Sequence, residues 1–134
     1  MTLRSLAGAL ALQAAVLVAA PSVAAEAPEA LVQRQVEAYN AGDVQAFANT
    51  YADDVELFEL GADSKPFLRG RAALIAEYGP MFAKAKPKAT ILHRTVSGAF
   101  VTDHERVTAG PRTVESVAVY QVESDKIRRV WFTP

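Results

Sequence analysis

The sequence predicts an α+β domain, with helices in its first half and an antiparallel sheet in its second. Between residues 28 and 82, apolar side chains recur every three or four positions, which is typical of helices with one buried face. From Thr90 onward, apolar and polar residues alternate, which is typical of strands. Turn sequences at positions 97–98, 109–111 and 124–125 separate these strands and predict hairpins.

An export signal is predicted at the N-terminus, over residues 1–25. Arg4 precedes an apolar stretch from Leu6 to Ala20, and small residues at positions 21–25 follow it. Cleavage before Glu26 would leave one domain, residues 26–134, in the periplasm or outside the cell. A retained membrane anchor is the alternative, but about 15 apolar residues is shorter than the 20 or so that span a bilayer.

The overall composition excludes several classes of protein. With 14 basic and 15 acidic side chains, the chain has no charge excess of the kind that nucleic-acid binding requires. It contains no cysteine, so neither disulfides nor a thiol nucleophile is available. It also lacks a glycine-rich phosphate loop and a nucleophile-elbow motif, so we expect no cofactor. The partner that we expect is a small apolar or carbonyl-bearing molecule.

Three helices are expected. Pro28 suits the first turn of the first helix, and Gly42 suits the left-handed residue that ends it. Asp43 is placed to cap a second, short helix. The third begins near Gly70, and Pro80 is expected to kink or end it because proline cannot donate a backbone hydrogen bond.

Five strands are expected, the first of them before the third helix. Residues 52–54 are expected to turn the chain into that strand, which covers 55–59, and residues 60–65 to form a loop. A short extended piece is expected at 66–69. The four later strands cover 89–96, 99–108, 113–123 and 126–132.

Glu59 is the first candidate for chemistry. Alternation places its carboxylate on the same face as Val55 and Leu57. A carboxylate among apolar neighbours holds its proton more tightly than it does in water. We therefore expect Glu59 to lie in an enclosed apolar site and to act as a general base.

A second group of charges is expected on the inner face of the strand at 99–108, where Val101, Asp103, Glu105 and Val107 point the same way. A two-residue turn would place Leu92 opposite Asp103, with Arg94 diagonal to it. Arg94 is expected to form an ion pair with Asp103 or Glu105. This pair either has a purely structural role, in which the two charges neutralise one another, or orients a polar substrate.

His93 and His104 are expected on the opposite face of this hairpin. Adjacent residues of a strand point to opposite sides, so these histidines cannot converge with Asp103 and Glu105 on a metal ion. No metal site is therefore expected.

Four segments resemble a known family: VQR at 32–34, YNAGD at 39–43, YADDV at 51–55 and KIRRVWF at 126–132. On these motifs the chain resembles SnoaL-like proteins of the nuclear transport factor 2-like superfamily, to which ketosteroid isomerases belong. The resemblance implies a curved antiparallel sheet wrapped around helices, with a cone-shaped pocket between them. It also implies a homodimer through the convex sheet face, which carries Val117, Val119, Arg129 and Trp131.

The isomerase roles carry over only in part. Glu59 falls where those enzymes keep their carboxylate base. Their hydrogen-bonding tyrosine falls near Gln35 and their protonated aspartate near Ala118, so both donors to the oxyanion are missing or altered. In ketosteroid isomerases the base acts together with both donors, and steroid isomerase activity is therefore not expected of this chain.

Two functions remain open. One is a cofactor-independent isomerase, cyclase or lyase that uses Glu59 as base, with Asp103, Glu105 and Arg94 as further catalytic groups. The other is a non-catalytic domain that binds an apolar ligand or forms a dimer. In both cases, the residues expected to line the site are Gln35, Tyr39, Tyr51, Tyr78, Phe82, Val101, Ala118, Tyr120 and Phe132.

Overall fold

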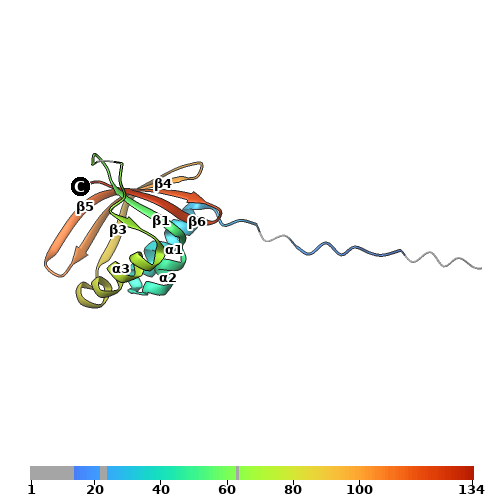
Figure 1. The fold of residues 1–134 in the computed structure, drawn as a ribbon, viewed down its shortest axis with the longest axis horizontal. Coiled ribbons are helices and arrows are strands. Elements are labelled where there is room, and N and C mark those ends of the chain that lie inside the picture. The colour runs from blue at the N-terminus through green and yellow to red at the C-terminus, as the bar shows by residue number, and fades with distance from the viewer. Residues whose placement is uncertain (1–13, 22–23, 63) are drawn as a thin grey trace, which may run out of the picture.

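The structure is a computed structural model that describes residues 14–21, 24–62 and 64–134. Most of the predicted export signal, at residues 1–13 and 22–23, lies outside the described residues. Residues 14–21 and 24–27 form neither helix nor strand, and they lead away from the folded domain (Figure 1). Among the described residues, no helix has the length and apolar character needed to cross a membrane.

The two N-terminal helices begin and end as their sequence signals predict. Helix α1 covers Pro28–Ala41 and ends at Gly42, whose φ of 68° and ψ of 21° lie in the left-handed region. Helix α2 covers Val44–Asn49, and the Asp43 side chain accepts a hydrogen bond of 3.0 Å from the backbone N–H of Ala46. Local capping chemistry therefore sets the boundary between these helices.

Helix α3 covers Arg71–Ala85 and continues through Pro80. Of the two effects expected of this proline, a kink or the end of the helix, the second does not occur. Leu74, on one side of Pro80, is fully buried, and Phe82, on the other side, is 4% exposed. Burial of apolar side chains on both sides compensates for the backbone hydrogen bond that proline cannot donate.

Six strands form one sheet in the order β2-β1-β6-β5-β4-β3. Residues 52–54 belong to the first strand and do not form the expected turn. The four later strands match their predicted bounds within about one residue. The bounds are β1 Tyr51–Glu59, β2 Leu68–Arg69, β3 Lys88–Ser97, β4 Phe100–Ala109, β5 Arg112–Glu123 and β6 Lys126–Phe132.

The sheet is mixed, not wholly antiparallel as predicted. Strands β3 to β6 pair through hairpins and are antiparallel, as is the short pair of β1 with β2. Strand β1, however, pairs with β6 in parallel, with Glu59 beside Phe132. A pairing between strands this far apart in sequence leaves no turn signal, so the hairpin pattern could not reveal it.

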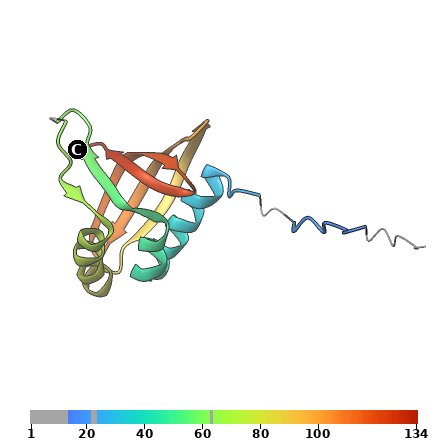
Figure 2. The same cartoon turned by 45° about the vertical axis from the view of Figure 1, so that its right-hand side comes forward.

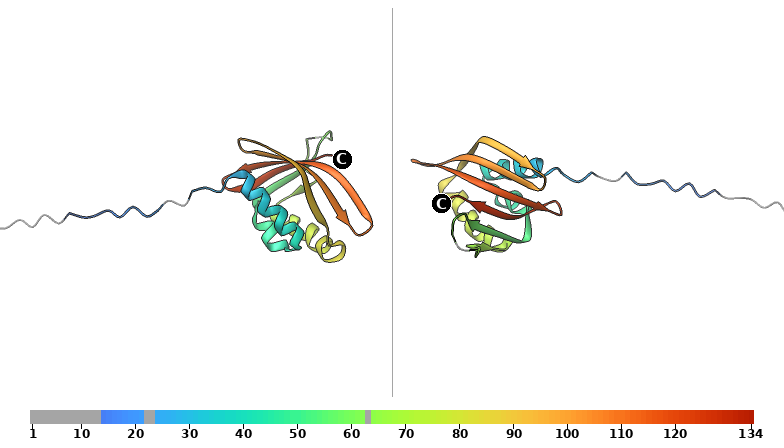
Figure 3. Two further views of the ribbon diagram at one scale, coloured as in Figure 1. Left: turned by 180° about the vertical axis from the view of Figure 1, so that it is seen from behind. Right: turned by 90° about the horizontal axis from the view of Figure 1, so that it is seen from above.

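The sheet curves over the three helices, which all lie against its concave face (Figures 1 and 2). Seen from above, the strands form one continuous layer with the helices beneath it (Figure 3). The core between these layers includes Leu31, Phe47, Leu57, Leu74 and Ile127, each at most 1% exposed. The α+β fold class predicted from the sequence is confirmed.

Candidate functional site

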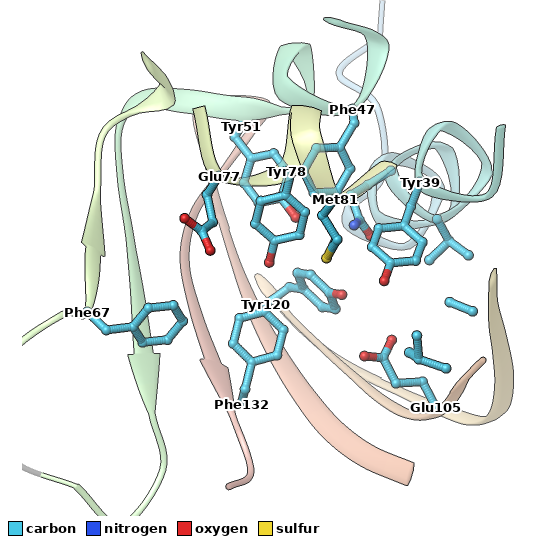
Figure 4. A pocket seen from close by; sticks show the side chains of 14 residues that line it. Tyr39, Phe47, Tyr51, Phe67, Glu77, Tyr78, Met81, Glu105, Tyr120 and Phe132 are labelled. Atoms are coloured by element: carbon cyan, nitrogen blue, oxygen red, sulfur yellow. The ribbon is translucent and has the colours of Figure 1, made fainter. Parts of the chain in front are cut away.

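A cavity of about 240 Å³ lies between the helices and the concave face of the sheet. Its walls are largely aromatic, and a few polar side chains point into it (Figure 4). All three helices contribute to the lining, as do strands β1, β3, β4, β5 and β6 and the segment before β2. The lining residues are Gln35, Val36, Tyr39, Phe47, Tyr51, Phe67, Glu77, Tyr78, Met81, Ala89, Glu105, Val107, Tyr120 and Phe132.

The structure brings together most of the residues that the sequence nominated for this lining. The predicted residues that do line the cavity are Gln35, Tyr39, Tyr51, Tyr78, Tyr120, Phe132 and the acid Glu105. Three others do not: Phe82, Val101 and Ala118 are core residues, at 4%, 0% and 0% exposure. Phe82 packs against the rings of Tyr39 and Phe47 between the helices, and Val101 and Ala118 are fully buried on the sheet.

Several lining residues were missed by the sequence analysis. Val36 and Phe47 had been recognised only as members of apolar helix stripes, and Val107 only as an inward-facing strand residue. Phe67 lies in the segment before β2, and Glu77 is an exposed residue of α3, so neither follows a buried periodic pattern. The remaining missed residues are Met81 and Ala89.

Glu105 is the buried acid of the cavity. It lies on the inward face of β4 and is 8% exposed. Burial raises the pKa of Glu105 to about 7, and the negative charge of Asp103 acts in the same direction. Ser116 opposes this effect by donating a hydrogen bond of 3.3 Å to Glu105 Oε1. The pKa of this carboxyl group therefore lies near neutral pH, well above that of an exposed glutamate.

Asp103 is fully buried behind the cavity and is paired with Arg94. Arg94 Nε donates to Asp103 Oδ1 at 2.6 Å, and Arg94 Nη2 donates to Asp103 Oδ2 at 2.8 Å. The third nitrogen, Nη1, donates to the side-chain oxygen of Gln33 at 3.0 Å. Neither Arg94 nor Asp103 lines the cavity, so their groups are occupied with one another and do not face a ligand.

The register of this hairpin differs from the predicted one. The turn falls at Gly98 and Ala99, so Arg94 lies directly opposite Asp103 and not diagonal to it. An irregularity between Ile91 and His93 then leaves Leu92 outside the described cross-strand pairs, although Leu92 was expected opposite Asp103. The inward direction predicted for Asp103 was correct, and the predicted Arg94 ion pair is confirmed.

Glu59 does not occupy the enclosed position predicted for it. It faces the same side of β1 as the buried Leu57, but it is the last residue of the strand and its side chain is exposed. It lies in a more open depression together with Phe67, Tyr78 and Phe132, which also line the cavity. The alternation pattern therefore identified the correct face, but the end of the strand is not covered.

Four tyrosines bring hydroxyl groups to the cavity. Burial raises the pKa of Tyr39 to about 12, with a smaller contribution from the charge of Glu105. Burial is also the main cause that raises the pKa of Tyr51, Tyr78 and Tyr120. All four are phenols at neutral pH and can donate hydrogen bonds. Figure 4 shows the hydroxyls of Tyr39 and Tyr120 turned toward the Glu105 carboxylate.

Gln35 is a polar residue that helix α1 contributes to the cavity lining. It is 4% exposed, and its side-chain oxygen Oε1 is buried without a hydrogen-bond partner among the described residues. An unpaired buried acceptor costs roughly 1–3 kcal/mol. A ligand with a hydrogen-bond donor would remove this cost.

The two histidines lie on the outer face of the sheet, as predicted. His93 and His104 are directly opposite one another on β3 and β4, and both are exposed. His104 Nε2 lies 3.3 Å from Glu115 Oε2. Within the described ranges, no group of three or more His, Asp or Glu side chains is arranged to hold a metal ion.

Known structures with a similar fold cover most of the domain. An uncharacterised cystatin-fold protein from Novosphingobium aromaticivorans is 25% identical, with a TM-score of 0.71 over 80% of this chain and 97% of that one. A candidate ketosteroid isomerase from Kribbella flavida is 21% identical, with a TM-score of 0.69 over 79% and 76% of the two chains. An epoxide hydrolase from M. tuberculosis, described as LEH-like, is 18% identical, with a TM-score of 0.64 over 77% and 78%.

At this level of identity the structural neighbours share the fold and nothing more specific. No curated protein sequence matched the chain. The family model for the SnoaL-like domain matches residues 32–130, which span α1 to β6 and include the buried acid Glu105 and most of the cavity lining. The chain therefore belongs to the SnoaL-like family and has the α+β fold of nuclear transport factor 2-like proteins.

Proposed function

We propose that the cavity binds a small, largely apolar molecule and that Glu105 exchanges a proton with it. The observation that carries this proposal is the position of Glu105: a buried carboxyl group in an aromatic cavity, with a pKa raised to about 7. A general acid or base works best when its pKa lies near the operating pH. Glu105 replaces Glu59 in this role because Glu59 is exposed.

The tyrosine hydroxyls supply the second element of such a reaction. Removing a proton next to a carbonyl group creates negative charge on the carbonyl oxygen, and hydrogen-bond donors already in place stabilise that charge. Tyr39 and Tyr120 have their hydroxyls on the same side of the cavity as Glu105 (Figure 4). This arrangement supports cofactor-independent isomerisation, cyclisation or elimination of a small carbonyl compound.

The size of the cavity restricts the ligand. At about 240 Å³ it is smaller than the roughly 300–1,000 Å³ of typical ligand sites. A steroid would not fit inside, which agrees with the missing donors at Gln35 and Ala118. We expect a compound of one or two small rings.

The first test measures whether Glu105 is a proton donor and acceptor. The carboxyl carbon of Glu105 should titrate near pH 7 in a ¹³C NMR experiment on the purified protein. The protein should also accelerate exchange of the acidic C–H protons of a small ketone such as 2-indanone in D₂O. Glu105→Gln should abolish this acceleration, while Glu59→Gln should retain it.

A different result would overturn the catalytic part of the proposal. If Glu105 titrates near 4.5, or if Glu105→Gln exchanges the ketone protons as fast as the unchanged protein, Glu105 is not the base. A non-catalytic binding domain is then the better description. The observation that favours this second function is Ala118, which has no hydrogen-bonding side chain where a donor to an oxyanion would be needed.

Export and dimerisation complete the proposal. Cleavage before Glu26 would deliver the domain to the periplasm or the medium, and the intact mass of the protein expressed with its leader would reveal the cut. A dimer would use the outer sheet face, where Val117, Val119 and Trp131 are only partly buried, with Trp131 stacked on Phe58 at a centroid distance of 5.5 Å. Sedimentation of Val119→Glu beside the unchanged protein tests this interface.

A further inference from the structure

The charged side chains among the described lining residues of the cavity are all acidic. Its 14 described residues include two acids, Glu105 and Glu77, and no lysine, arginine or histidine. Glu77 is exposed on α3, and Figure 4 shows its carboxylate on the cavity side of the helix, near Tyr78. An anionic ligand such as a carboxylate or a phosphate would find no positive charge among these described lining residues to pair with.

Arg94, the positively charged residue behind the cavity, already has hydrogen-bond partners in the protein. Arg94 uses two nitrogens on the two carboxylate oxygens of Asp103 and a third on Gln33. The influences on Glu105 are burial, the charge of Asp103 and the hydroxyl of Ser116, and none of these is a cation. When Glu105 ionises, it therefore becomes a buried carboxylate with no cationic partner in the described part of the chain. Such an arrangement is costly unless a ligand supplies the positive charge.

The walls of the cavity suit a positive charge. Aromatic rings attract cations through the negative potential of their faces, and groups of such rings recognise organic ammonium ions. Phe47 packs against Tyr51 and Tyr78 at centroid distances of 5.0 and 4.9 Å, and Phe67 lies 6.4 Å from Phe132. These rings come from α2, α3, β1, β6 and the segment before β2, so they surround the cavity from several sides.

Gln35 supplies an independent indication of a hydrogen-bond donor on the ligand. Its buried Oε1 has no partner among the residues that the structure describes, and only an N–H or O–H group can satisfy a carbonyl oxygen. An ammonium group carries up to three N–H donors together with its charge. It therefore meets the requirements of both Glu105 and Gln35, whereas an alcohol meets only that of Gln35.

We infer that the ligand of this cavity is a small organic amine in its protonated form, held by aromatic rings, the carboxylate of Glu105 and the carbonyl oxygen of Gln35. This inference rests on the proposed function, since it requires that the cavity binds a small molecule. It adds the charge and the hydrogen-bonding character of that molecule. A bound ammonium group also favours the ionised form of Glu105, which is the form that can accept a proton.

Binding of an amine is consequently linked to the ionisation of Glu105. A carboxyl group with a pKa of about 7 is roughly 10% ionised at pH 6 and 90% at pH 8, so the affinity for an ammonium ion should rise about tenfold between these values. The titratable or charged groups that influence Glu105 or share its cavity are Asp103 with its partner Arg94, Glu77, Tyr39, Tyr51, Tyr78 and Tyr120, while its neighbour His104 points to the outer face of the sheet. The four tyrosines stay protonated throughout this range, and Glu105 is the buried acid among the lining residues.

Three probes of similar size and different charge test the inference: 2-phenylethylamine, 2-phenylethanol and phenylacetate. Calorimetric titration at pH 8 should give an affinity for the amine at least tenfold higher than for the alcohol, with phenylacetate the weakest. The affinity for the amine should fall about tenfold at pH 6, and that for the alcohol should not. Glu105→Gln should remove the advantage of the amine and its pH dependence but retain binding of the alcohol. Glu37→Gln, the same change on the exposed side of α1, should behave as the unchanged protein does.

Each outcome separates the inference from the proposed function. If the alcohol or phenylacetate binds as tightly as the amine at pH 8, the inference is wrong while small-molecule binding stands. If none of the three probes binds at millimolar concentration, both are wrong. If Glu105→Gln does not fold, the pH dependence of amine binding to the unchanged protein decides, and an affinity equal at pH 6 and pH 8 overturns the inference.

Discussion

Arg94 and Asp103 lie directly opposite one another on β3 and β4 and share two hydrogen bonds, of 2.6 and 2.8 Å. The Asp103 side chain is fully buried, and that of Arg94 is 12% exposed. The pair closes the inner face of the hairpin behind the cavity. It also places a negative charge two residues away from Glu105, on the same face of β4.

Breaking this pair should destabilise the fold strongly. Arg94→Met leaves a buried carboxylate without its partner, which costs about 3–5 kcal/mol, and urea denaturation measures the loss. Replacing both residues, as in Arg94→Met with Asp103→Leu, should recover most of it because no buried charge remains. Arg34→Met, which breaks an exposed pair with Glu26, is the matched control and should cost less than about 1 kcal/mol. Equal losses at Arg94 and Arg34 would contradict the prediction.

Asp103→Asn should lower the pKa of Glu105 from about 7 toward its ordinary value of 4.5. The charge of Asp103 disfavours ionisation of Glu105, and removing it leaves burial as the main cause of the raised pKa. A ¹³C NMR titration of the Glu105 carboxyl carbon checks the direction. Asp125→Asn, at the exposed turn between β5 and β6, serves as control and should leave the titration unchanged. A pKa that stays constant or rises in Asp103→Asn would exclude electrostatic coupling between the two acids.

Glu105 should make the protein less stable as the pH rises. Below pH 4.5 its carboxyl group is protonated in both the folded and unfolded states, and it imposes no penalty. Between pH 4.5 and about 7 the unfolded chain ionises first, so the free energy of unfolding falls. Above about pH 7 the decrease in the free energy of unfolding that Glu105 causes is constant. At about 1.4 kcal/mol per pKa unit, it amounts to roughly 3 kcal/mol for a pKa raised from 4.5 to about 7.

Glu105→Gln isolates this effect because glutamine resembles the protonated acid in shape and does not ionise. The difference in unfolding free energy between the variant and the unchanged protein should grow in favour of the variant from pH 4.5 to 7. Contributions from other carboxyl groups cancel in this difference. A difference that stays flat over this range would show that Glu105 has an ordinary pKa in the folded protein.

Asp43→Ala should weaken the junction between α1 and α2. The aspartate side chain accepts a hydrogen bond from the backbone N–H of Ala46, which otherwise has no partner within the first turn of α2. Loss of such a cap costs about 1 kcal/mol, and thermal or urea denaturation detects it. Asp43→Asn retains an oxygen acceptor and should lie much closer to the unchanged protein. If both variants are equally destabilised, the negative charge is responsible and not the hydrogen bond.

The sequence determined those features that depend on neighbouring residues. Gly42 and Asp43 fixed the helix boundary, because capping acts within one turn of helix. The alternation in β4 fixed the direction of Asp103 and Glu105, because successive side chains of a strand point to opposite faces. Lysine, arginine and histidine are missing from the described cavity lining, but this follows only from which residues the fold brings together.

Tertiary structure decided which of two acids is enclosed. Glu59 and Glu105 both face the concave side of the sheet, yet Glu59 is the exposed last residue of β1, while Glu105 is buried in the cavity on a strand that contacts α1. The face of the sheet to which a side chain points alternates with a period of two residues and is therefore a local property. How deeply the side chain is buried depends on which helix covers its position. Strand β1 takes its place in the sheet by pairing in parallel with β6. The irregularity at Leu92 changes the register of the β3–β4 hairpin. The sequence pattern predicts neither feature. The parallel pairing joins segments that are distant in the chain, and the irregularity consists of a single extra residue in a strand.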